Sequence, residues 1–144
     1  MGNALDPGVT ALRMVVVNID AGLELTPTAT EFLLLGVPDL GNIQYEVRYV
    51  GYSAVTLPVD AGVAVEFDLE WVDDSAADAV ANLKADYDLQ TGPTVRVMNT
   101  VWEGSQILDP GDTLNAEMDV ATPTTASEGA ALVVVYKVLG ASGY

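Results

Sequence analysis

The 144-residue chain contains no cysteine and no histidine. These two absences exclude disulfide bonds, thiolate nucleophiles and most zinc and copper sites, and they remove the most common general base. Nucleophile motifs such as G-x-S-x-G and S-x-x-K are also missing, as is a glycine-rich phosphate loop. We therefore expect a protein that is not an enzyme, with no catalytic residues, no cofactor-binding residues and no cofactor.

Basic residues are scarce as well. Five lysines and arginines stand against 21 aspartates and glutamates, which gives a formal net charge of -16. A surface of this sign repels phosphate and disfavours nucleic acids and anionic membranes as partners. No apolar run approaches the roughly 18 residues of a membrane span. Because histidine is absent, no ordinary side chain titrates between about pH 5.5 and 8, and we expect attachment to a partner to be nearly independent of pH there.

Short apolar or alternating runs, separated by turn residues, dominate the sequence. This pattern predicts an all-β sandwich or barrel of about eight strands. Turn compositions agree, since Asp20-Ala21-Gly22 supplies a glycine and Asp109-Pro110-Gly111-Asp112 sets proline at the second position of a turn. The expected strands are 13–19, 31–36, 43–51, 62–72, 94–102, 113–120 and 130–139, with 53–58 as the candidate for an eighth.

One segment has a different spacing. In residues 75–88, SAADAVANLKADYD, the apolar positions Ala76, Val80, Leu83 and Tyr87 follow helical spacing. We therefore predict one short helix here, with its apolar face lying on the sandwich.

Three of the expected strands are apolar on both faces. TLNAEMDV alternates cleanly, whereas MVVVNI, FLLLG and AALVVVY do not. A strand in a two-sheet sandwich has only one inner face, so a run that is apolar on both faces needs a second cover. We expect the helix and the N-terminal arm to cover part of this surface and neighbouring subunits to cover the rest.

The stretch VEFDLEWVDD places Glu66, Asp68 and Glu70 at every second position, with apolar residues between them. On one face of a strand these acids lie about 7 Å apart, which overlaps the separations used by paired glycosidase carboxylates. A catalytic acid needs burial to raise its pKa, and the alternation indicates instead that the acids face water. We interpret Glu66, Asp68 and Glu70 as a solvated or contact face, with catalysis as the alternative.

Metal binding is a weaker hypothesis. Asp86 and Asp88 have the spacing of a calcium loop, but the glycine and the closing glutamate of such a loop are missing. We therefore expect no metal ligands, and an irregular calcium site among Asp73, Asp74 and Asp78 stays open as the alternative.

Aromatic residues offer another alternative, because their faces pack on sugar rings. Residues of this kind more often serve as core or interface anchors. The candidates for a sugar-stacking platform are Tyr45, Tyr49, Tyr52, Trp71 and Trp102.

The segment VWEGSQILDPGDTLNAEMDVATPTTASEGAALVVVYKVL resembles the C-terminal half of small jelly-roll proteins that decorate the heads of tailed bacteriophages. EFLLLGVPDLGNIQYEVRYVG and LQTG are also similar to that group, so the resemblance covers most of residues 28–139. It implies a homotrimeric jelly-roll β-sandwich on the outer surface of the virion, where an N-terminal arm clasps neighbouring subunits. Similar P-G-D turns occur in cupins, but the metal-binding histidines of a cupin are absent here.

We accordingly expect an N-terminal arm, residues 1–12, followed by one jelly-roll domain, residues 13–144. Leu5, Pro7, Val9 and Leu12 of the arm are the expected contacts with the capsid or a neighbour, because a purely solvating tail needs no apolar side chains. The expected function is that of a cement protein, which stabilises the phage head by bridging major capsid subunits. A carbohydrate-binding module or head-fibre domain remains the alternative.

Overall fold

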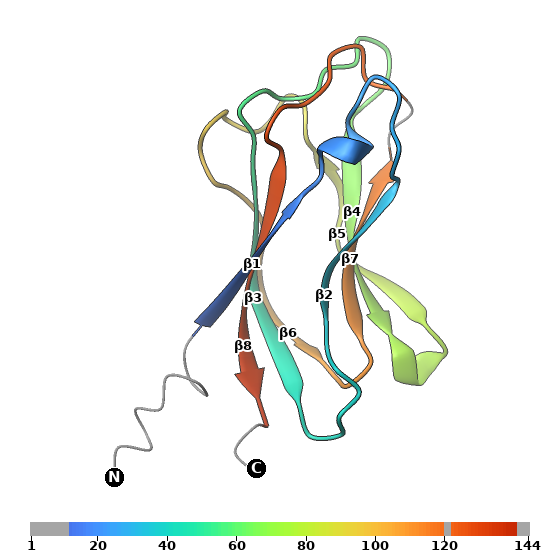
Figure 1. The fold of residues 1–144 in the computed structure, drawn as a ribbon, viewed down its shortest axis with the longest axis vertical. Coiled ribbons are helices and arrows are strands. Elements are labelled where there is room, and N and C mark those ends of the chain that lie inside the picture. Colours follow the sequence, from blue (N-terminus) through green and yellow to red (C-terminus); the bar gives the residue numbers. More distant parts are fainter. Residues whose placement is uncertain (1–11, 120–121, 141–144) are drawn as a thin grey trace.

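A computed structural model of the protein describes residues 12–119 and 122–140, which form two four-stranded antiparallel sheets packed face to face (Figure 1). The predicted all-β class, the eight strands and the sandwich are confirmed in this part of the chain. Sheet A has the order β1 (Leu12–Asn18), β8 (Ala131–Leu139), β3 (Gln44–Ser53) and β6 (Asn99–Leu108). Sheet B has the order β2 (Glu31–Gly36), β7 (Thr113–Asp119), β4 (Glu66–Asp73) and β5 (Ala79–Asp88).

The first four strands pair in reverse order with the last four. β1 pairs with β8, β2 with β7, β3 with β6 and β4 with β5, all antiparallel. The chain therefore behaves as one long two-stranded ribbon that crosses between the sheets as it proceeds. β1 and β6 are the edge strands of sheet A, and β2 and β5 are the edge strands of sheet B.

The core lies between the sheets and is built from alternate residues of each strand. Phe67 and Leu69 of β4 and Tyr52 of β3 are fully buried, and the ring of Tyr87 from β5 stands edge-on to both aromatic rings. The run FLLLG, which is apolar at successive positions, forms β2. This strand carries a bulge between Leu33 and Leu35, which interrupts the strict alternation of faces. The bulge buries both Leu34 and Leu35, whereas Leu33 of the same run stays 63% exposed.

The turn predicted at residues 109–112 is present. The backbone N–H of Asp112 donates to the carbonyl of Asp109 at 2.9 Å, and Gly111 adopts the positive φ, 90°, that the turn requires. The buried carboxylate of Asp112 accepts the indole N–H of Trp71 at 3.1 Å and the backbone N–H of Asp74 at 3.0 Å. This aspartate therefore ties the β6–β7 turn to the end of β4.

Asp20 holds together segments that are more than 100 residues apart in the sequence. Its carboxylate accepts hydrogen bonds from the Ser127 hydroxyl at 2.5 Å and from the backbone N–H groups of Gly129 and Ala130 at 3.0 and 2.9 Å. Burial raises the pKa of Asp20, but these hydrogen bonds and one from Asn18 outweigh the burial and leave it below its ordinary value.

The helix predicted over 75–88 is wrong. Asp74–Ala76 form a single 3-10 turn, Ala77 and Asp78 adopt positive φ, and β5 then pairs with β4. Two successive left-handed residues end a helix, and a spacing of four, as in Leu83 and Tyr87, is compatible with a strand as well. Leu83 and Tyr87 pack on the core, whereas Val80 is exposed, as a strand requires for residues three apart.

The other boundaries differ less. The candidate eighth strand at 53–58 is also wrong, because beyond Ser53 it contains only an isolated bridge from Thr56 to Glu128. The strand expected at 94–102 begins later, at Asn99, and runs to Leu108. Within the described ranges, no helix has the length and apolar character needed to cross a membrane.

Candidate functional site

Sheet B presents a strongly acidic outer surface. Phe67 and Leu69 of β4 point into the core, so Glu66, Asp68 and Glu70, which alternate with them, point outward. Acids from the other three strands join them. We call this set the acidic face: Glu31 on β2, Glu117 and Asp119 on β7, Glu66, Asp68 and Glu70 on β4, and Asp86 and Asp88 on β5.

The strand register places these acids directly opposite one another. Glu117 pairs with Glu31 on one side and with Asp68 on the other, so three carboxylates form a row across β2, β7 and β4. Glu66 likewise pairs with Asp119 and Asp88. Like charges that face each other across strands destabilise a sheet. The isolated subunit therefore carries repulsion that a cation, a proton or a basic partner would relieve.

Glu70 differs from Glu66 and Asp68, the other two outward-pointing acids of β4. It is only 8% exposed, so the expectation that all three acids face water is wrong for Glu70. Burial, a hydrogen bond with Glu117, and the charges of Glu117, Glu31 and Asp68 raise the pKa of Glu70 to about 7. A carboxylate pair makes such a bond only when one member is protonated. The expectation that nothing titrates near neutrality is therefore contradicted.

Three other acids of the acidic face also lie close together. Carboxylate oxygens of Glu66, Asp86 and Asp119 all lie within 4.8 Å of one another. Asp86 reaches this position at a bulge in β5, where it adopts φ of 50° and its backbone N–H donates to Asp68 at 2.8 Å. Burial first, and then the charges of the surrounding acids, raise the pKa of Glu66. Oxygen ligands in this arrangement suit a hard cation such as Ca²⁺.

The alternative calcium site does not share this arrangement. Asp73 accepts hydrogen bonds from the Ser75 backbone and hydroxyl at 3.0 and 2.7 Å, which caps the 3-10 turn. Asp74 and Asp78 lie in the same hairpin turn. The carboxylates of Asp73, Asp74 and Asp78 do not come close enough to share a metal ion; in the described part of the chain only Glu66, Asp86 and Asp119 do.

The aromatic candidates do not come together on one surface. Tyr52 is completely buried, and the ring of Tyr45 contacts that of Tyr136 in a tilted arrangement, with centroids 4.8 Å apart and an interplanar angle of 42°. Trp71 and Trp102 pack against the core. These four candidates serve as core anchors, whereas Tyr49 lies on the outer face of sheet A beside Met98, so the five candidates form no common sugar-binding platform.

The arm prediction falls largely outside the described residues. Leu5, Pro7 and Val9 lie there, while Leu12 is the first residue of β1 and is 58% exposed. The boundary between arm and domain therefore belongs at least one residue earlier than predicted.

Sequence reasoning found Glu66, Asp68 and Glu70 as one strand of the acidic face but did not join them to the acids of the other three strands. Glu117 and Asp119 had a readable signal, since they occupy outward positions of the alternating run TLNAEMDV. Asp86 and Asp88 were considered only as part of a calcium loop, because the helix prediction hid their position on a strand beside β4. The pairing of Glu31 with Glu117 depends on strand order, which alternation within a strand does not reveal.

Comparison with known proteins adds no relative: no family model, curated protein or solved structure matches this chain.

Proposed function

We propose that this chain is a non-enzymatic decoration, or cement, protein of a tailed-phage head. In this proposal it is a homotrimeric jelly roll on the outer surface of the virion, and it stabilises the head by bridging major capsid subunits. The acidic face contacts the shell, and residues 1–11 add a second contact.

The strand order supports the jelly-roll part of the proposal. A jelly roll is a ribbon of eight strands rolled into two facing sheets. The orders β1-β8-β3-β6 and β2-β7-β4-β5 are those that such a rolled ribbon produces when its first half pairs with its second.

The observation that carries the proposal is the row of Glu31, Glu117 and Asp68 across three strands. Like-charged neighbours on a sheet oppose folding, and the burial of Glu70 beside them adds desolvation to the repulsion. A basic shell surface would offset the repulsion on contact. An outward position would also keep a chain of charge -16 away from the packaged nucleic acid.

The direct test is co-sedimentation with empty expanded heads of the encoding virus, prepared without this protein. The double variant Asp68→Asn/Glu117→Gln should bind at least about tenfold more weakly at low salt, and wild-type binding should weaken as salt rises. The matched control is Glu24→Gln/Asp39→Asn, which changes the net charge equally but lies off the acidic face. Equal losses in both variants, or none in either, would refute the contact role of the acidic face.

The contact expected from the N-terminal arm is tested in the same assay. Deletion of residues 2–11, which spares Leu12 in β1, should leave the fold and mass unchanged and weaken retention at least about tenfold. Aggregation of the deleted protein would show instead that these residues cover their own subunit.

A further inference from the structure

The outer face of sheet A carries an exposed apolar strip along its edge strand. Leu12, Met14 and Val16 of β1 alternate with core-facing valines and are 58%, 67% and 57% exposed. Met14 and Val16 pair with Val135 and Val133 of the neighbouring strand β8. These are residues of the sequence runs MVVVNI and AALVVVY, which are apolar on both faces.

The apolar strip continues onto β3. Tyr49 pairs with Val135, and its ring lies together with the Met98 side chain over Gly51, where an added Cβ would stand 2.5 Å from the Met98 sulfur. Gly51 therefore gives these two larger side chains room to lie flat on the sheet. The apolar strip comprises Leu12, Met14, Val16, Tyr49, Met98, Val133 and Val135, of which Val133 is only 6% exposed because its neighbours cover it.

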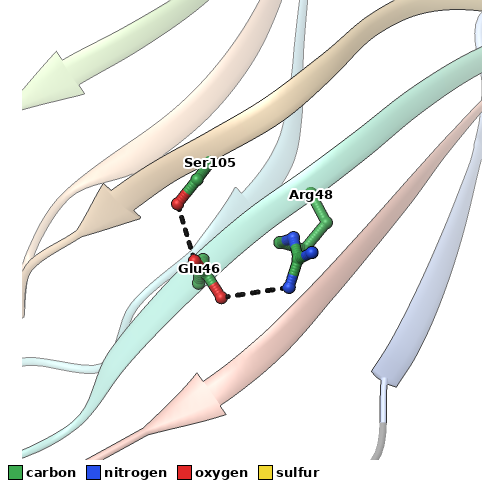
Figure 2. Close-up of polar contacts among 3 residues, drawn as sticks. All are labelled: Glu46, Arg48 and Ser105. Carbon is green, nitrogen blue, oxygen red and sulfur yellow. Dashed lines mark hydrogen bonds and ion pairs between the residues drawn. The ribbon is translucent and has the colours of Figure 1, made fainter.

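The charges on this face balance. Figure 2 shows Glu46 and Arg48 of β3 joined at 3.5 Å, with the Ser105 hydroxyl of β6 donating to the other oxygen of Glu46 at 2.6 Å. The Ser105 hydrogen bond, together with the charges of Arg48 and Lys137, holds the pKa of Glu46 below its ordinary value. Glu103 pairs with Tyr49, so β3, β6 and β8 carry two acids, Glu46 and Glu103, beside two cations, Arg48 and Lys137.

This balance distinguishes sheet A from sheet B. Two copies that each carry a net charge of -16 repel one another, and they repel most where acidic faces meet. The outer face of sheet A is where they can approach with the least repulsion and bury apolar side chains. The segment 75–88, which we expected to cover part of the apolar surface as a helix, is instead β5 of sheet B and cannot cover β1.

We propose that the outer face of sheet A is the surface on which a second copy of this chain packs, with Met14 and Val16 at the centre of the contact. This inference rests on the proposed function, because it assigns the subunit interface of the homo-oligomer. The rival occupant is the chain's own segment 1–11, which joins β1 at Leu12 and is long enough, at up to about 36 Å when extended, to lie along the strip.

The first test compares Val16→Glu with Val80→Glu. Both valines are 57% exposed and both lie on edge strands, but Val80 belongs to β5 of sheet B. Mass is measured by light scattering over a wide range of protein concentration, with circular dichroism as the check of folding. Val16→Glu should raise the dissociation constant of the oligomer at least about 100-fold, because it places an unpaired charge in an apolar contact. Val80→Glu should leave it within about threefold of wild type.

The second test does not depend on disrupting the contact. The chain has no cysteine, so a single introduced thiol reports its own exposure. At oligomeric concentrations, the thiol from Met14→Cys should react with a soluble disulfide reagent at least about tenfold more slowly than the thiol from Val80→Cys. Dilution to the monomer should remove the difference. The same measurement on protein that lacks residues 2–11 shows whether a second copy or the chain's own N-terminal segment protects the thiol.

The outcomes separate the two occupants and the two proposals. Protection that is lost on dilution and kept in the deleted chain supports the inference. A monomeric wild type, equal effects of the two glutamates, or protection that vanishes with residues 2–11 overturns it. A monomer that still binds heads overturns this inference and the homotrimeric part of the proposed function, but leaves head binding standing. An oligomer with the predicted contact that ignores heads overturns head binding alone.

Discussion

Replacing Glu70 with glutamine should stabilise the protein at neutral and alkaline pH. The folded-state pKa of about 7 exceeds the ordinary value of 4.5, so the native state holds this proton more tightly than the unfolded chain does. The stability from that protonated acid is fully present below about pH 4.5 and is lost as pH rises toward 7. A shift of this size corresponds to about 3 kcal/mol at pH 8, when one pKa unit is taken as 1.36 kcal/mol.

Glutamine keeps the shape of the protonated acid and can still donate a hydrogen bond to Glu117. Glu70→Gln should therefore raise the free energy of unfolding by up to about 3 kcal/mol at pH 8 and change it little at pH 4. Urea denaturation of the wild type and the variant at several pH values measures the difference directly. Subtracting one curve from the other removes the contribution of the remaining carboxylates.

The matched control is Glu103→Gln, which removes the same charge from an exposed position on the other sheet and should change the free energy of unfolding at pH 8 by less than about 1 kcal/mol. The reasoning is refuted if Glu70→Gln and wild type show the same pH dependence. It is also refuted if the variant is less stable at pH 8, since that would mean the charged carboxylate has a partner that compensates its burial.

Three further substitutions test the packing and hydrogen bonding of the sandwich by thermal or urea unfolding. Asp20→Ala should destabilise the protein by about 3 kcal/mol, because it removes charge-assisted hydrogen bonds to Ser127 and to the backbone just before β8. A loss below about 0.5 kcal/mol would show that these hydrogen bonds do not stabilise the fold. Gly22→Ala places a methyl group 2.9 Å from Met118 and should cost about 1 to 3 kcal/mol, whereas Gly92→Ala meets nothing within 4 Å and should be nearly neutral. Tyr52→Phe should be neutral or stabilising by about 1 kcal/mol, because the buried Tyr52 hydroxyl has no hydrogen-bond partner among the described residues; clear destabilisation would indicate a partner.

The strands with strict alternation of apolar and polar residues were predictable, because a repeat of two residues fits a strand and not a helix. The alternating run that forms β7 was placed within one residue of its observed end, Asp119. β5 was missed because a spacing of four residues satisfies both a helix and a strand. Local preference for helix in this alanine-rich segment was overridden by pairing with β4 and by the left-handed residues Ala77 and Asp78.

The acidic face was predictable only in part, for a different reason. Alternation says which face of a strand a side chain occupies, but not which strands lie beside it. Glu70 is buried by its neighbours on the adjacent strands. It pairs with Asn115 of β7 on one side and with Asn82 of β5 on the other. Its raised pKa follows first from burial and then from Glu117, Glu31 and Asp68, and of these causes only Asp68 lies within VEFDLEWVDD.

If the acidic face binds the shell and sheet A binds a second copy, as proposed, shell binding and self-association should be coupled. Charge on the acidic face raises the electrostatic free energy of bringing copies together through sheet A, even though that face is itself balanced. A basic shell that neutralises the acidic face removes part of this repulsion, so neighbouring copies should associate more strongly on the head than in solution. Occupancy of heads should consequently rise more steeply than a simple binding curve, and Val16→Glu should abolish the steepness while leaving the first copies bound. A hyperbolic curve for the wild type would show that the two faces act independently.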